Sequence, residues 1–194
     1  NRDKMEGSLL GNKHSEVEIE KDLESLEANY ILLEKKDLIK KVAKYLSQKK
    51  IIGWFVGRME FGPRALGARS ILADPRSDDM QKMLNLKIKY RESFRPFAPS
   101  IAEDQLENWF ETKFKSPYML HVAKIKESKK KNMSSEEEKL FGIEKLNIPR
   151  SYLPAITHVD YSARVQTVSK KTNPRYHQLI SAFKRKTGCP CIVN

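Results

Sequence analysis

The sequence lacks the features that mark a membrane protein or a disulfide-stabilised secreted protein. No apolar run approaches the roughly 18 residues that a membrane-spanning helix requires. Only two cysteines are present, Cys189 and Cys191, and two thiols this close in sequence cannot provide a disulfide framework. The cysteine content predicts a reducing, cytoplasmic compartment, and the sequence predicts no association with a membrane.

Residue patterns typical of metal sites and of common catalytic motifs are also missing. The four histidines follow no ligand spacing, and Cys189 and Cys191 have no second pair that would complete a zinc site. There is no glycine–lysine phosphate loop and no nucleophile elbow. We therefore predict no metal site in this chain. His158, two residues before Asp160, is the one histidine placed where it could touch a ligand.

Acidic residues are scarce in two blocks of the chain. Residues 51–100 carry nine basic and five acidic side chains, and residues 150–194 carry eight basic side chains and a single acid, Asp160. In residues 1–50 and 101–149 the two signs nearly balance, so the two blocks account for almost all of the net charge of +12. A concentrated positive charge predicts a phosphate-rich partner, either a nucleotide or a nucleic acid. Solubility alone is the alternative explanation.

Short helices and strands are predicted to alternate along the chain. This pattern is typical of an α/β fold of the α+β type, with a mixed twisted sheet and flanking helices. Asp37 is the expected cap of the first helix, and one helical turn is expected between Gly62-Pro63 and Gly67. The expected helices cover residues 37–49, 77–88, 103–110 and 173–187, and the expected strands cover residues 51–56, 71–73, 119–125, 155–159 and 164–168 and a segment from about 191.

Three segments differ in their organisation. Residues 1–50 are interpreted as a linker and the end of a preceding lobe, and residues 51–194 as the main domain. Residues 126–150 hold a lysine run and a glutamate run with few apolar anchors, which predicts a mobile surface insertion. The chain begins without Met and stops in an apolar, strand-like run, which we interpret as the sign of a fragment.

Arginine occurs in three loops whose sequences are unusually stiff for a solvated cation. Arg95, for example, lies between Phe94 and Pro96-Phe97, on a backbone that the proline holds extended. Guanidinium groups bind phosphates with two parallel hydrogen bonds and keep their charge, and held rigidly they stabilise a departing pyrophosphate. The alternative for each single arginine is a solvated or salt-bridged side chain. The cations of the three loops are Arg58, Arg64 and Arg69, then Lys89, Arg91 and Arg95, then Arg164.

Several of these segments together resemble the NodU/CmcH family of carbamoyltransferases. The matching motifs are Gly53–Arg76, Lys89–Ser100, Ser116–Met119, Thr157–Asp160, Ala163–Val168 and Thr187–Asn194. The resemblance implies a two-lobed protein. Its Kae1-like N-terminal lobe carries a metal and transfers carbamoyl to a hydroxyl. Its C-terminal lobe is similar to YrdC/Sua5 and condenses ATP with carbamoyl phosphate into carbamoyl-adenylate. This chain is similar to the second lobe.

The resemblance also implies roles for individual residues. The expected binding residues for ATP and carbamoyl phosphate are Arg64, Lys89, Arg91, Arg95, Arg164 and Asn194, and Lys89 and Arg95 are expected to assist the departure of pyrophosphate. ATP is thus a substrate, and a metal is expected only in the N-terminal lobe. Two departures from the family pattern stand out. Tyr161 replaces the usual glycine, and the Thr-Ser-Phe-Asn that normally follows Asn194 is absent.

Two other functions stay open at this point. The chain is a candidate for a YrdC-like basic module that binds RNA, although we expect a nucleic acid less than a nucleotide. It is also a candidate for a non-catalytic remnant that keeps only a structural role. We expect the isolated chain to make no carbamoylated product.

Overall fold

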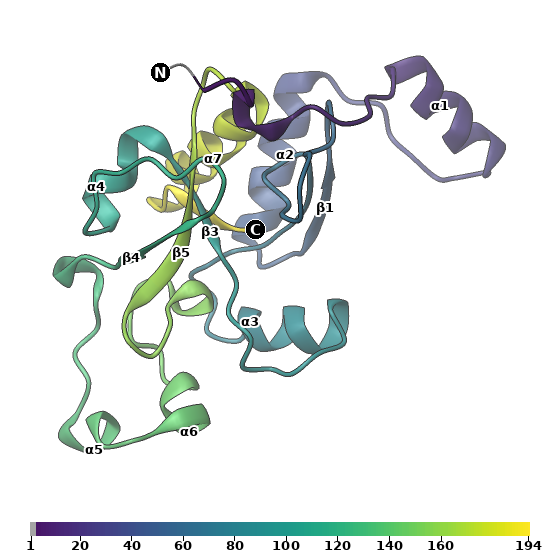
Figure 1. Ribbon diagram of the computed structural model, residues 1–194. Coiled ribbons are helices and arrows are strands. Elements are labelled where there is room, and N and C mark those ends of the chain that lie inside the picture. Colours follow the sequence, from purple (N-terminus) through teal and green to yellow (C-terminus); the bar gives the residue numbers. More distant parts are fainter. Residues whose placement is uncertain (1–2) are drawn as a thin grey trace.

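A computed structural model describes residues 3–194 of the chain and gives them a mixed α/β fold (Figure 1). The larger sheet has the strand order β4-β5-β3-β6. Strand β3 (Pro99–Ala102) pairs in parallel with β5 (Ser162–Val168) and antiparallel with β6 (Cys191–Val193), and β4 (His121–Lys124) pairs antiparallel with β5. The predicted fold class, α+β with a mixed sheet, is confirmed.

A two-stranded ribbon lies beside this sheet. Strand β1 (Ile52–Phe55) pairs antiparallel with β2 (Arg69–Leu72), and a bridge between Ala73 and Val193 connects the ribbon to β6. The glycine–proline loop, residues 56–68, joins the two strands, so the ribbon holds both ends of the loop that carries Arg64.

Two long helices pack against one another and cover the core (Figure 1). Helix α2 (Lys35–Ser47) corresponds to the helix predicted at residues 37–49 and buries Ile39, Val42, Ala43 and Leu46. The expected cap was wrong, because the helix begins after Glu34 and Asp37 lies inside its first turn. Since these side chains belong to the common core, residues before 51 contribute to this fold. The proposed boundary at residue 50 stays a prediction.

Helix α7 (Pro174–Thr187) has the ends that the sequence predicted. The side chain of Asn173 accepts a hydrogen bond from the backbone N–H of Tyr176, and Pro174 occupies the first turn. Gly188 ends the helix in the left-handed conformation, with φ of 76°. The residues at the two ends of the helix were therefore enough to predict its bounds from the sequence.

The remaining helices are short or peripheral. The helix predicted at residues 77–88 is α3 (Met80–Met83) followed by the π-helix η2 (Leu84–Ile88), and the one predicted at 103–110 is η3 (Glu103–Gln105) followed by α4 (Leu106–Trp109). In the N-terminal region, η1 (Glu6–Ser8) precedes α1 (Glu16–Ser25), which buries none of its side chains and extends away from the body (Figure 1). No helix within residues 3–194 is both long and apolar enough to cross a membrane.

The insertion at residues 126–150 forms short elements at the end of the molecule opposite α7 (Figure 1). These are η4 (Glu127–Lys129), α5 (Ser135–Glu138) and α6 (Gly142–Leu146), and a bridge from Lys130 to Ser151 connects the insertion to the body. Next in the chain, η5 (Pro154–Ile156) lies where we expected a strand. That strand was wrong, because β5 takes β3 and β4 as its partners.

Candidate functional site

A pocket of about 520 Å³ opens where β5 begins. Three of its lining side chains are arginines, Arg91, Arg95 and Arg164, and the only carboxylate among them is Asp160. Two of the three arginine loops noted in the sequence therefore converge here. We call this cavity the Arg164 pocket, and its lining residues are Arg91, Arg95, Pro96, Phe97, Ala98, Val122, Ile156, His158, Asp160, Ser162, Ala163 and Arg164.

The third loop comes near Arg164 through Arg64, which does not itself line the pocket. The pKa of Arg164 is lowered, first because surrounding protein displaces water from its guanidinium and second because the positive charge of Arg64 acts on it. Among the described side chains, those of residues 3–5 and 7–194, no carboxylate forms an ion pair with either arginine. The Nε of Arg64 is buried and has no hydrogen-bond partner within that part of the chain. Two cations held together without a counter-charge favour an anionic ligand between them.

The loop that carries Arg64 is held by a buried carboxylate. The Oε1 atom of Glu60 accepts hydrogen bonds from the backbone N–H groups of Leu66 (2.7 Å), Ala68 (2.6 Å) and Arg69 (3.2 Å). The helical turn predicted for this segment was wrong, because these amides bind Glu60 and adopt no helical pattern. Glu60 is thus a structural anchor for the backbone of this loop.

Replacing Glu60 with alanine is expected to destabilise the fold by about 2–4 kcal/mol, because three N–H groups lose their charged acceptor. Urea denaturation measures the loss. Glu136→Ala, which removes an exposed carboxylate from α5, is the control and should cost less than about 0.5 kcal/mol. Equal costs for the two variants would contradict the anchoring role.

A polar network joins this loop to three strands. Gln166 on β5 donates from Nε2 to the carbonyl of Leu66 (2.8 Å), and its Oε1 accepts from Ser100 Oγ on β3 (2.6 Å). Asn194, just after β6, donates from Nδ2 to Ala65 O, Ser100 Oγ and Gln166 Oε1, and its Oδ1 is buried without a partner among the described residues. The network fixes the loop relative to the pocket.

The second arginine loop is held by η2. Asn85 is buried and donates from Nδ2 to the carbonyls of Ser93 (3.0 Å) and Arg95 (2.8 Å). Its Oδ1 accepts from Arg91 Nε at 2.7 Å, and the Arg91 guanidinium lies 5.0 Å from the centroid of the Phe97 ring. Arg91 is therefore fixed on both sides of its guanidinium.

Arg95 and Lys89 are held less firmly than Arg91. Arg95 lines the pocket but is half exposed, and its Nε donates to Glu92 at 3.0 Å. Lys89 is exposed at the end of η2 and is not among the residues that line the pocket. The structure thus brings Arg91, Arg95 and Arg164 into the lining of the pocket and places Arg64 near Arg164, whereas neither Arg64 nor Lys89 lines the pocket itself.

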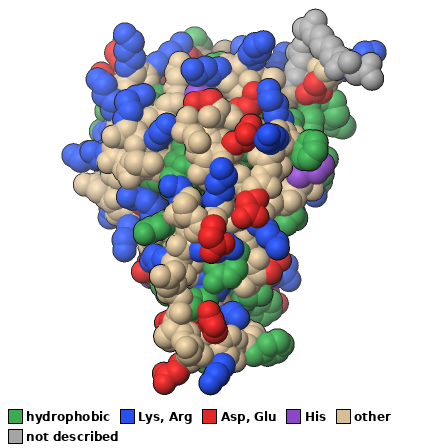
Figure 2. Space-filling view, turned by 90° about the vertical axis from the view of Figure 1, so that its left-hand side faces the viewer, with side chains coloured by type: hydrophobic (Ala, Val, Ile, Leu, Met, Phe, Trp, Pro, Cys, Tyr) green, Lys and Arg blue, Asp and Glu red, His purple; other side chains and the backbone are tan. Residues whose placement is uncertain are grey.

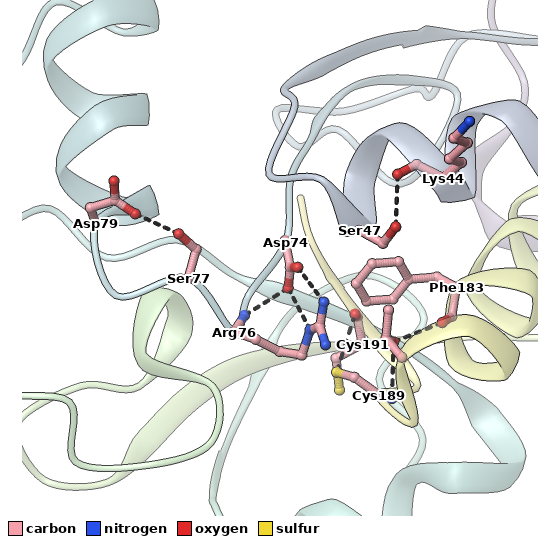
Figure 3. A network of polar contacts seen from close by, with 10 residues as sticks. Lys44, Ser47, Asp74, Arg76, Ser77, Asp79, Phe183, Cys189 and Cys191 are labelled. Carbon is pink, nitrogen blue, oxygen red and sulfur yellow. Dashed lines mark hydrogen bonds and ion pairs between the residues drawn. The ribbon is translucent and has the colours of Figure 1, made fainter.

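A neighbouring arginine shows the opposite environment (Figure 3). Arg76 forms two hydrogen bonds to the carboxylate of Asp74, at 3.0 and 2.7 Å, and this contact raises its pKa. Its guanidinium also lies 5.4 Å from the centroid of the Phe183 ring. Arg76 therefore stabilises the fold and has its charge satisfied, which distinguishes it from Arg64 and Arg164.

One wall of the Arg164 pocket is the turn at His158–Ser162. Asp160 accepts from the N–H and the hydroxyl of Ser162, and the hydroxyl contact is the main reason that the pKa of Asp160 is lowered. Tyr161 adopts a left-handed φ of 62°, the conformation that glycine would take without steric cost. Its hydroxyl donates to Met133 Sδ at 3.2 Å, so the insertion at residues 126–150 holds this tyrosine side chain.

A buried arginine supports the same wall from behind. Arg150 is 2% exposed and donates to the carbonyls of Lys145, Ile148 and Thr157, and burial lowers its pKa. Sequence analysis missed Arg150, Asn85 and Gln166. A polar residue in an otherwise apolar strand was the only available signal for Gln166, and the contacts of the other two depend on the folded chain.

Comparison with known proteins places this site in a family. A model of the carbamoyltransferase C-terminus matches residues 43–194. The chain belongs to this family. The resemblance to carbamoyltransferases is therefore confirmed, and the arginine loops described above lie inside the matched region.

Three relatives show how much of a larger protein the chain represents. An uncharacterized protein of Synechocystis sp. is 55% identical over 99% of this chain and 32% of its own length. Nodulation protein NolO of Bradyrhizobium diazoefficiens is 38% identical over 97% of this chain and 31% of its own length. A 3'-hydroxymethylcephem-O-carbamoyltransferase of Amycolatopsis lactamdurans is 38% identical over 77% of this chain and 24% of its own length. The chain spans about a third or less of each relative.

Proposed function

We propose that the Arg164 pocket binds ATP and carbamoyl phosphate as part of an O-carbamoyltransferase. The observation that carries this proposal is the Arg64–Arg164 pair: the positive charge of Arg64 contributes to lowering the pKa of Arg164, the Nε of Arg64 is buried without a partner, and no carboxylate among the described side chains pairs with either arginine. A relative named as an O-carbamoyltransferase supports the transferred group. The product formed at this site would be carbamoyl-adenylate, and a Kae1-like lobe elsewhere in the longer protein would pass the carbamoyl group to a hydroxyl.

The chemistry explains why several cations are needed. Water would first hydrolyse carbamoyl phosphate to carbamate and inorganic phosphate. An oxygen of the carbamate would then bond to the α-phosphorus of ATP while the bond from that phosphorus to the oxygen bridging to the β-phosphorus breaks, so negative charge builds on the departing pyrophosphate. Arg64 and Arg164 would bind phosphate oxygens with their forked N–H groups. Arg91 is already fixed by Asn85 and Phe97 and would add a third preorganised donor.

The remaining residues have roles of different kinds. Arg95 is proposed to assist pyrophosphate departure after exchanging its contact with Glu92 for the ligand. Lys89 would have to act from the rim, because it does not line the pocket. The Nδ2 of Asn194 already serves three acceptors, so its proposed ligand contact rests on Oδ1, an acceptor suited to an amino group such as that of the carbamoyl moiety.

Calorimetric titration of the 194-residue chain tests the proposal. We expect saturable binding of ATP and of carbamoyl phosphate, with pyrophosphate competing for the ATP site. Incubation with an added hydroxyl acceptor should give no carbamoylated product from this chain alone. Failure of a folded chain to bind either compound at millimolar concentration would refute the assignment of the pocket.

A further inference from the structure

A second basic region lies away from the Arg164 pocket. Two hollows of about 640 and 630 Å³ adjoin each other and share Lys35 and Pro174 as lining residues. The first lies between residues 9–19, the end of β1 and the start of α7, and the second lies between α2 and α7. We call the two together the α2–α7 groove. None of its lining residues also lines the Arg164 pocket.

The groove is lined almost entirely by one sign of charge. Among the lining residues whose side chains are described, the only carboxylate is Glu16, whose Oε1 lies 3.8 Å from Lys35 Nζ in an exposed contact of little energetic value. On the face shown in Figure 2, by contrast, basic and acidic side chains are interspersed. The lysines and arginines lining the groove are Lys13, Lys35, Lys36, Lys40, Arg58, Lys170, Arg175 and Arg185.

Few of these cations are neutralised. Besides Lys35, only Lys40 has a carboxylate within ion-pair distance among the described side chains, Asp37 at 3.2 Å. Neutral hydrogen-bonding side chains, including Thr172, Asn173 and Gln178, lie between the charges. A run of cations of this kind attracts an extended polyanion more strongly than a single small anion, because every phosphate that it binds releases counterions.

Aromatic groups at one end of the groove favour a nucleic acid over an acidic peptide. Phe55 is 56% exposed and lines the first hollow, the Arg69 guanidinium lies 3.5 Å from its ring centroid, and the His14 ring lies 6.1 Å away. Proteins bind single-stranded nucleic acids with planar side chains beside a line of cations. The bases stack on aromatic rings and guanidinium groups, and the phosphates bind the cations. An acidic peptide would use the cations only.

We infer that the α2–α7 groove binds single-stranded nucleic acid. The inference is independent of the function proposed for the Arg164 pocket. The two regions lie at opposite ends of β5, since Arg164 is at its beginning and Lys170 follows its last residue, Val168.

Fluorescence anisotropy with a labelled 15-nucleotide RNA measures this binding as a function of salt concentration. For about five phosphate contacts we expect log Kd to rise with log salt with a slope of about 3.5. Lys36→Glu combined with Arg185→Glu should weaken binding at least tenfold and flatten this slope. Both side chains are exposed, so the fold should persist, as circular dichroism will verify. Arg164→Gln should leave RNA affinity within about twofold, even if the Arg164 pocket proves to bind no nucleotide.

The matched control carries the same change of charge outside the groove. Lys113→Glu combined with Lys139→Glu, both exposed, should weaken RNA binding by less than about threefold through the lower net charge alone. Equal losses in the two double variants would overturn the inference, because binding would then follow net charge only. Binding of a glutamate oligomer as tightly as the RNA would overturn it in favour of an acidic protein partner.

Discussion

Replacing Arg164 with glutamine is expected to weaken the binding of ATP and pyrophosphate by about 10- to 100-fold while leaving the fold intact. A charge-assisted hydrogen bond contributes about 1.5–3 kcal/mol, and glutamine keeps neither the charge nor the forked donors. Calorimetry on the two proteins measures the change in Kd. Arg164→Lys should bind more tightly than Arg164→Gln but more weakly than the unchanged protein, because an ammonium keeps the charge but cannot donate two parallel hydrogen bonds to a phosphate.

The stability of the same variant gives a second, independent check. Since the pKa of Arg164 is lowered in the fold, its charged form is less favourable there than in the unfolded chain. Removing the charge at pH 7 should therefore leave Tm unchanged or raise it. Arg185→Gln, on α7, is the control and should leave ATP binding unaltered. A clear loss of Tm in Arg164→Gln would show that Arg164 serves the fold instead of a ligand.

Replacing Gly67 with alanine is expected to cost about 3 kcal/mol or more and to prevent stable folding if the native margin is small. A Cβ at this position would lie 2.1 Å from Cδ1 of Tyr176, and the backbone φ of 100° is strained for any side chain. Tyr176 cannot move away easily, because it is fully buried within the core. Urea denaturation measures the loss.

The control and the double variant separate the two causes of that loss. Gly53→Ala adds a Cβ that meets no atom within 4 Å and should cost little. Tyr176→Ala removes the obstructing ring, so Gly67→Ala made in that background should cost less than it does alone. If the two losses simply add, the steric contact does not account for the effect.

Elements with local signals could be predicted from the sequence, and contacts between distant segments could not. Helix α7 has its cap, its proline and its terminal glycine within a few residues of its ends, so it was placed correctly. The strand predicted at residues 155–159 was wrong, because β5 pairs with β3 and β4, whose paired residues lie 38 or more positions away along the chain. The glycine–proline loop was predicted as helix, because nothing local shows that one carboxylate, Glu60, binds three of its amides.

The candidate site was predicted in part for the same reason. Its arginines were visible because they lie in stiff loops, and the family resemblance singled out Arg64, Arg95 and Arg164. Their convergence required the fold, since Arg64 and Arg164 are a hundred residues apart. Lys89 was selected from a short motif, yet the end of η2 carries it to solvent. Its role stays a prediction.

The network around Gln166 has a consequence for how the protein is made. The ribosome makes the loop that bears Arg64 well before Asn194, which donates to Ala65 O, Ser100 Oγ and Gln166 Oε1 and follows β6, the last element described here. A nascent chain that has released only the first 180 residues lacks both β6 and this amide. The support that Asn194 gives to the Arg64 loop should therefore appear abruptly during translation, once residues 191–194 have left the ribosomal tunnel.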